Sequence, residues 1–185
     1  MDSNRIVGGQ TASLPIPWQV SVRQGPEGGG HLCGGTILDR KTVLCAAHCF
    51  EQVGSSMKGY YVMAGAVGKY DTSGQTIAIS YGIWNNDMPY TGSNGYKNDF
   101  IILKLESDFG FNQNVQPACL PSSSTYNPDN LGKKCFTSGW GRLQHGNELN
   151  LFFASFKPRS SKKLSTYLFF CSSFQKRVRR SSEIF

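Results

Sequence analysis

Several features that define other classes of protein are missing from this sequence. Its 185 residues include no apolar run of about 18 residues, the length that crosses a bilayer, so we expect no membrane span. Residues 1–5 hold no apolar stretch resembling a secretory signal, so we expect the sequence to lack its native N-terminus. Residues 151–185 hold none of the 21 glycines, on which the hairpins of a β-rich domain depend. We therefore expect this segment to lie outside the preceding domain.

The net charge of +7 does not indicate a nucleic-acid partner, because of where it lies. Residues 1–150 hold 11 Lys and Arg against 11 Asp and Glu, a balance of zero. Residues 151–185 hold 8 Lys and Arg against Glu183, which accounts for the whole excess. The basic run at 176–180 could be a nuclear signal, an anion-binding patch or a convertase site, but such runs are usually only solvated. We expect no nucleic-acid partner.

The hydrophobic pattern of the first two thirds of the chain is typical of strands. Short alternating runs, separated by Gly, Asn, Asp and Ser, occur at 18–22, 35–38, 42–46, 60–64, 76–79 and 99–105. Runs of this length and spacing predict an all-β antiparallel barrel and not βαβ units. Residues 107–129, with three prolines and three consecutive serines, predict a surface connector between two halves. A further strand is expected at 134–141.

Two residues of this region are candidates for proton-relay chemistry. His48 lies in Ala46-Ala47-His48-Cys49, and Asp99 precedes the apolar run Phe100-Ile101-Ile102-Leu103. A serine hydroxyl attacks only when a base accepts its proton, and imidazole titrates near neutrality. A carboxylate behind the ring would hold its tautomer. The alternatives are a structural histidine and an Asp that caps a turn. His31 and His145 have no such context and are expected to be ordinary loop residues.

Six motifs occur in a fixed order between residues 5 and about 148. They are Arg5-Ile6-Val7-Gly8-Gly9, Pro17-Trp18-Gln19-Val20-Ser21-Val22, Cys33-Gly34-Gly35-Thr36-Ile37 with Ala46-Ala47-His48-Cys49, Asn98-Asp99 with Leu103-Lys104-Leu105, Val115-Gln116-Pro117-Ala118-Cys119-Leu120-Pro121, and Ser138-Gly139-Trp140-Gly141-Arg142. Together they resemble the chymotrypsin-like (trypsin-family) serine proteases. The resemblance implies a fold of two antiparallel Greek-key barrels, of which the second is incomplete here. It divides the chain into a propeptide remnant (1–5), a truncated protease domain (6–150, with 6–106 as first barrel, 107–129 as connector and 130–150 as start of the second) and a non-homologous basic tail (151–185).

The resemblance also implies roles for individual residues. His48 would act as general base and acid, with Asp99 orienting it. The bond between Arg5 and Ile6 would be the zymogen cleavage site, and Cys33 and Cys49 would form a disulfide. Four further cysteines would lack partners: Cys45, which replaces a threonine of the family, Cys119, Cys135 and Cys171.

The nucleophile that the family requires is not found in the 185 residues. The family carries it in Gly-Asp-Ser-Gly-Gly, where glycines expose the hydroxyl and aim backbone N–H groups at the oxyanion. No serine after Arg142 has a glycine neighbour: Ser155, Ser160, Ser161, Ser165, Ser172, Ser173, Ser181 and Ser182. Loss of one oxyanion donor alone lowers turnover about 10²–10³-fold. We expect the chain as it stands not to hydrolyse peptides.

We expect no metal and no cofactor. The group Cys45-x-x-His48-Cys49 could suggest zinc, but a disulfide through Cys49 would remove that ligand, and the pattern is not the Cys-x-x-Cys-His of haem attachment.

Three functions remain compatible with the sequence. The first is a secreted trypsin-like endopeptidase acting on polypeptides and bound by their inhibitors, represented here by an incomplete chain. The second is a non-catalytic homologue that binds partners through the surviving barrel. The third is a mis-spliced product with no function. Residues 151–185 would follow from a premature end, an alternative splice or read-through, or else be a genuine divergent tail.

Overall fold

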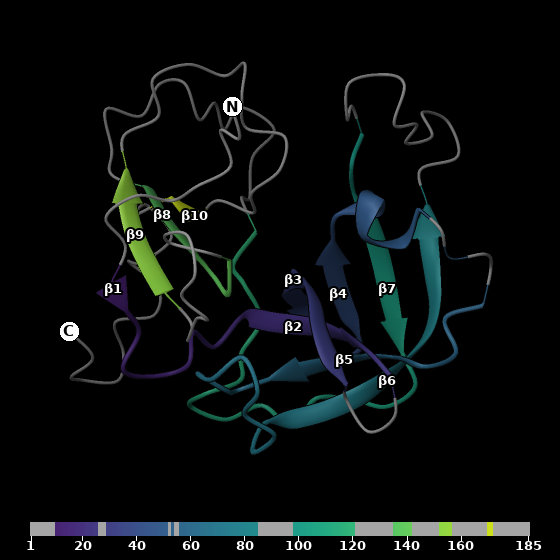
Figure 1. Ribbon diagram of the computed structural model, residues 1–185, viewed down its shortest axis with the longest axis horizontal. Coiled ribbons are helices and arrows are strands. Elements are labelled where there is room, and N and C mark those ends of the chain that lie inside the picture. Colours follow the sequence, from purple (N-terminus) through teal and green to yellow (C-terminus); the bar gives the residue numbers. More distant parts are fainter. Residues whose placement is uncertain are drawn as a thin grey trace.

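Strands account for nearly all regular structure of the computed structural model (Figure 1). The structure describes residues 10–25, 29–51, 53, 56–84, 98–120 and 135–141, together with the backbone of strands at 152–156 and 170–171. At 135, 136, 152–156 and 170–171 only the backbone pairing is described. No helix in these parts is long and apolar enough to cross a membrane.

Six strands close into an antiparallel barrel in the order β2-β3-β4-β7-β6-β5. They are β2 (Gln19–Gln24), β3 (Gly30–Asp39), β4 (Thr42–Cys45), β5 (Tyr60–Ala64), β6 (Gln75–Trp84) and β7 (Ile101–Leu105). The last strand, β7, lies between β4 and β6, and β5 closes the ring on β2. Each of the six alternating runs in the sequence overlaps one of these strands. The all-β prediction and the antiparallel barrel are confirmed.

Apolar side chains at alternating positions of the strands fill the inside of this barrel. In β7 the side chains of Ile101, Leu103 and Leu105 are buried, while the two residues between them are only partly so. Successive residues of a strand face opposite sides, so this pattern places one row of every strand in the core. The largest fully buried side chains are Val20, Val22, Ile37, Val43, Phe50, Val62, Met63, Ile101, Leu103, Leu105 and Phe109. Each contributes roughly 1.5–3 kcal/mol on burial.

Gly35 allows β2, β3 and β4 to approach one another closely. A Cβ at this position would lie 2.9 Å from Val20 Cγ2 and 3.0 Å from Val43 Cγ1. These separations are shorter than van der Waals contact, so any larger residue would push the strands apart. The glycine thus fixes the wall of the barrel on which the candidate site stands.

A second sheet lies beside the barrel in Figure 1, with the strand order β1-β9-β8-β10. Its strands are β1 (Gln10–Thr11), β8 (Cys135–Gly139), β9 (Phe152–Phe156) and β10 (Phe170–Cys171). The strand expected at 134–141 is β8. The described residues form no closed second barrel, and β9 and β10 belong to the segment 151–185. The domain boundary at residue 150 stays a prediction.

The described part of the expected connector, residues 107–120, packs on the barrel. Phe109 and Val115 are almost completely buried, and the backbone N–H of Ala118 donates to Ile37 O at 2.9 Å. Residues 121–129 lie outside the described parts of the chain.

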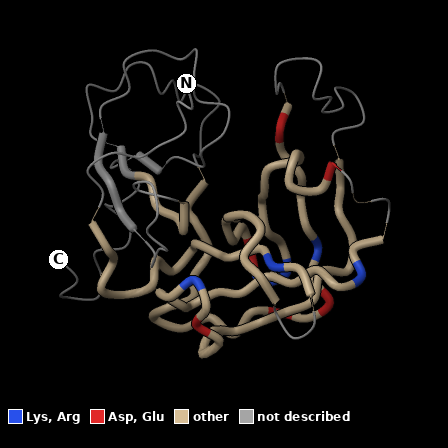
Figure 2. Tube along the Cα trace, in the orientation of Figure 1, with Lys and Arg blue, Asp and Glu red and all other residues tan. Residues whose placement is uncertain are grey.

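Charges are balanced over the described residues (Figure 2). They include six basic side chains, at 23, 40, 41, 58, 69 and 104, and six acidic ones, at 39, 51, 71, 99, 106 and 108. The two signs are interspersed and no basic face forms on the barrel in this view.

Candidate active site

His48 is presented by a short 3-10 helix directly after β4. This turn, η2 (Ala47–Phe50), is anchored by Ala47 and Phe50, whose side chains are 0% exposed. Because the two anchors point into the barrel, the intervening His48 faces outward at the barrel's end. Its side chain keeps 34% of its surface accessible.

Asp99 is positioned by the start of β7. The preceding Asn98 has φ 56°, a left-handed conformation that asparagine tolerates better than most residues, and its carbonyl accepts the N–H of Phe100 at 2.8 Å. The register of β4 on β7 pairs Cys45 with Ile101. The turn that follows Cys45 and the turn that precedes Ile101 therefore meet at one end of the barrel.

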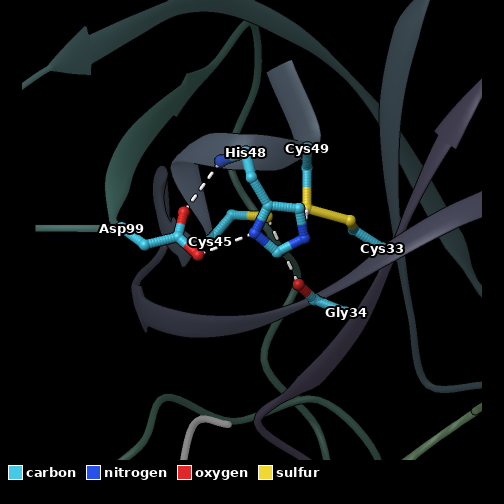
Figure 3. A network of polar contacts seen from close by, with 6 residues as sticks. All are labelled: Cys33, Gly34, Cys45, His48, Cys49 and Asp99. Atoms are coloured by element: carbon cyan, nitrogen blue, oxygen red, sulfur yellow. Dashed lines mark hydrogen bonds and ion pairs between the residues drawn. A yellow bond between two sulfur atoms is a disulfide. The ribbon is translucent and has the colours of Figure 1, made fainter. Parts of the chain in front are cut away.

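The meeting of these turns creates a paired His and Asp (Figure 3). His48 Nδ1 lies 2.7 Å from Asp99 Oδ2, and the backbone N–H of His48 donates to Oδ1 at 2.8 Å. The Asp99 side chain is 1% exposed. A buried carboxylate that accepts from the backbone N–H through one oxygen uses the other to hold a proton on Nδ1, which leaves Nε2 as the basic nitrogen.

A disulfide between Cys33 and Cys49 connects β3 to the turn that carries His48. The two Cα atoms are 6.4 Å apart, and the expected pairing is confirmed. It limits how far η2 can move from the barrel. Cys49 Sγ lies 3.7 Å from His48 Nε2.

Cys45 lies beneath this pair as a buried thiol. It is 1% exposed and its Sγ donates to Gly34 O at 3.3 Å (Figure 3). Burial, reinforced by the charge of Asp99, raises the pKa of Cys45 to about 12. The thiol therefore stays protonated at neutral pH and acts as a weak hydrogen-bond donor, neither a nucleophile nor a metal ligand.

The ligand atoms of Cys33, His48 and Cys49 lie within 4.8 Å of one another, a spacing that would suit a metal ion. The two sulfurs are bonded to each other, however, and a disulfide sulfur offers no thiolate. In this oxidised form the group fits a relay anchored by a disulfide better than a metal centre.

Neither of two hollows on the described surface includes His48 or Asp99. One, of about 490 Å³, is lined by residues 64–65, 73–75 and 112–115, and the other, of about 290 Å³, by 56–61, 78–80 and 106. The pair of His48 and Asp99 is therefore located by side-chain geometry and not by cavity size.

The structure corrects one interpretation of the sequence. His31 was expected to be an ordinary loop residue, but it lies within β3, is partly buried, and contacts Ser21 and Trp140. The one signal in the sequence that could have placed His31 in a strand was its position two residues before Cys33, on the same side of an alternating strand. His145, Arg5 and Ile6 lie outside the described residues, so the expected cleavage site is not placed.

The register of β10 on β8 places two other cysteines opposite each other. The Cα of Cys171 in β10 is paired with that of Cys135 in β8. Cys119, like Cys45, has a free thiol, and it is exposed.

A closed antiparallel barrel with a buried aspartate behind an outward histidine is the arrangement of the chymotrypsin-like class. The Trypsin family model matches residues 6–168, more than half of the chain. The chain therefore belongs to the trypsin family. The match passes residue 150 and ends between β9 and β10.

Proposed function

We propose that this chain provides the base and the orienting carboxylate of a trypsin-like serine endopeptidase, and that its 185 residues alone do not catalyse. The observation that supports the first part is the 2.7 Å contact between His48 Nδ1 and the buried Asp99 Oδ2. The absence of a glycine-flanked serine after Arg142 supports the second. Polypeptides would be the substrates and an extracellular location is expected, in keeping with the family.

The geometry defines what each residue would do in acyl transfer. Asp99 holds the Nδ1–H tautomer, so Nε2 would be the nitrogen that takes a proton from a hydroxyl. That nitrogen would accept the proton as the hydroxyl oxygen attacks a peptide carbonyl, and the charge of Asp99 would stabilise the imidazolium. The imidazolium would then return the proton to the leaving amine. Cys33–Cys49 keeps the turn in place throughout.

Two elements of this reaction have no residues among the 185. One is the attacking hydroxyl. The other is the set of backbone N–H donors for the oxyanion, and the loss of one such donor lowers turnover about 10²–10³-fold. We propose that cleavage after Arg5 would free the Ile6 ammonium, which in the family pairs with an acid beside the nucleophile. That acid is not found either, so cleavage alone would not create activity.

A fluorophosphonate probe tests the second part of the proposal. The chain, treated with trypsin to cut after Arg5 and then freed of the protease, should remain unlabelled, whereas active trypsin labels fully. Labelling of any serine within 151–185 would contradict the proposal. Sequencing of the transcript and its gene beyond residue 150 would show whether a Gly-Asp-Ser-Gly-Gly segment follows in another frame or exon.

A chimera tests the first part. Residues 1–150 joined to the remainder of the second barrel of an active trypsin-family protease should react with the probe after cleavage behind Arg5. His48→Gln in the chimera should abolish labelling within detection, and Asp99→Asn should slow it. Cys119→Ala, an exposed thiol away from the pair, is the matched control and should label normally. Equal labelling with and without His48 would contradict the relay.

A non-catalytic binding protein is the second candidate, favoured by a barrel that closes without any nucleophile segment. It predicts a secreted, soluble product ending at Phe185 that captures a polypeptide partner. A transcript that always continues into the protease reading frame would contradict it.

A further inference from the structure

Three contacts join the barrel to the segment that contains β8. Ser138 Oγ donates to Gln19 Oε1 at 2.9 Å, and Trp140 Nε1 donates to Val67 O at 2.9 Å. The Trp140 ring also packs on the His31 ring, with centroids 5.5 Å apart and planes tilted by 56°. Trp140 is 5% exposed, so it is the main apolar side chain of this junction among the described residues. Only the third contact involves a titratable group.

The hydrogen bonds around His31 are compatible with its neutral form. Arg23 can only donate, and its Nε lies 3.3 Å from Ser21 Oγ. With Arg23 Nε donating to its oxygen, the Ser21 hydroxyl can give its single proton to His31 Nδ1, 2.8 Å away, when that nitrogen carries no proton. A proton on Nδ1 would leave the Ser21 hydroxyl proton without this acceptor, and Ser21 is 0% exposed. Buried polar hydrogens without acceptors are costly.

Charge acts in the same direction. The charged groups that act on His31 are Lys69 of the β5–β6 connection and Arg23 of β2, both cationic, while the Asp71 carboxylate interacts with Arg23 and accepts the Ser73 N–H at 2.8 Å. Residues 137–141, on the other side of the ring, contain no ionisable side chain. Burial first, then Lys69 and Arg23, lower the pKa of His31 to about 4.

Arg23 cannot move away to relieve this repulsion. It is 2% exposed, and its Nη2 donates to Lys69 O at 2.7 Å and to Asp71 O at 3.2 Å. Protonation of His31 would therefore add a third positive charge beside Arg23 and Lys69, and displacement of the His31 ring would relieve the repulsion at the expense of its contact with Trp140.

We propose that His31 is an acid-sensitive switch: its protonation releases Trp140 and loosens the β8 segment from the barrel. The state in which Trp140 packs on His31 is called closed, and the state in which it is released is called open. At neutral pH His31 is uncharged and the closed state is favoured. In the open state His31 is solvated and regains its ordinary affinity for a proton, so acid favours opening.

The size of the effect follows from linkage. His31 has a pKa of about 4 in the closed state, against the ordinary value of 6.5. The ratio of open to closed molecules should then rise about 200-fold as the pH falls from 7 to about 3.5, with most of the change between 6.5 and 4.

The test follows two signals of the full chain by NMR between about pH 7.5 and pH 3.5. The His31 ring resonance gives its titration, and the indole N–H of Trp140, assigned from its loss in Trp140→Phe, gives exposure to a paramagnetic co-solute. We expect His31 to titrate well below 6.5 and the relaxation of the Trp140 indole to increase over the same range. His31→Gln should remove the acid-induced change, whereas His48→Gln should keep it.

Lys69→Gln provides a test that does not alter the junction itself. It removes one repelling charge but keeps the carbonyl that Arg23 contacts, so His31 should titrate higher and Trp140 should open less at a given pH. Titration of His31 near 6.5 in the folded chain would overturn the proposal. So would an indole that stays protected while His31 gains its proton, or an unchanged transition in His31→Gln.

Discussion

At the scale of single residues, Asp99 is the most constrained polar side chain of the candidate site. Both of its oxygens accept hydrogen bonds from one residue, His48, and its side chain is 1% exposed. Because the two acceptors are held by different donors of the same residue, the carboxylate fixes the position of the turn as well as the tautomer of the ring. Its importance is therefore structural and chemical at once.

Asp99→Asn should reverse the tautomer of His48. The amide oxygen can still accept from the His48 backbone N–H, but the NH₂ group then faces Nδ1, which must become an acceptor and move the proton to Nε2. Imidazole ¹⁵N shifts at neutral pH report which nitrogen is protonated. Asp71→Asn, remote from the ring, is the control and should leave His48 unchanged. Persistence of Nδ1–H in Asp99→Asn would show that this carboxylate does not set the tautomer.

At the scale of elements, much of the barrel could be predicted, and the reasons are physical. The alternating run at 60–64 coincides with β5, and the run at 76–79 lies inside β6. Alternation identifies strands because one face of each is buried. It does not specify which strands pair, so the register of Cys45 on Ile101 that aligns the site came only from the structure. His31 was misjudged because β3 extends back to Gly30, and that extension depends on pairing with β2.

Removal of the disulfide should destabilise the element that carries His48. Cys33 and Cys49 are 16 residues apart, and a closed loop of this length stabilises a fold by about 3 kcal/mol through the entropy of the unfolded chain. Cys33→Ala combined with Cys49→Ala should lower the free energy of unfolding by about that amount in urea titrations. Cys119→Ala should have little effect, since that thiol is exposed. A double variant as stable as the parent would show that η2 is held by packing alone.

At the scale of the whole molecule, stability should reside in the closed barrel. Leu103 is 0% exposed at its centre, whereas Leu120 is 62% exposed. Leu103→Ala should cost about 2–5 kcal/mol, because it removes buried methylene groups and leaves a cavity. Leu120→Ala should change stability by no more than about 0.5 kcal/mol. Urea unfolding followed by far-UV circular dichroism compares the two, and equal losses would place the core elsewhere.

The sheet order has a consequence for self-association. Every strand of the barrel has a paired neighbour on both sides, and only parts of the longest strands, such as residues 30–34 of β3 and 81–84 of β6, are paired on one side alone. In the described residues, the outer members of the other sheet are β1 and β10, and each spans two residues. A strand of a neighbouring copy that added to either of these edges would therefore find few backbone hydrogen bonds to extend.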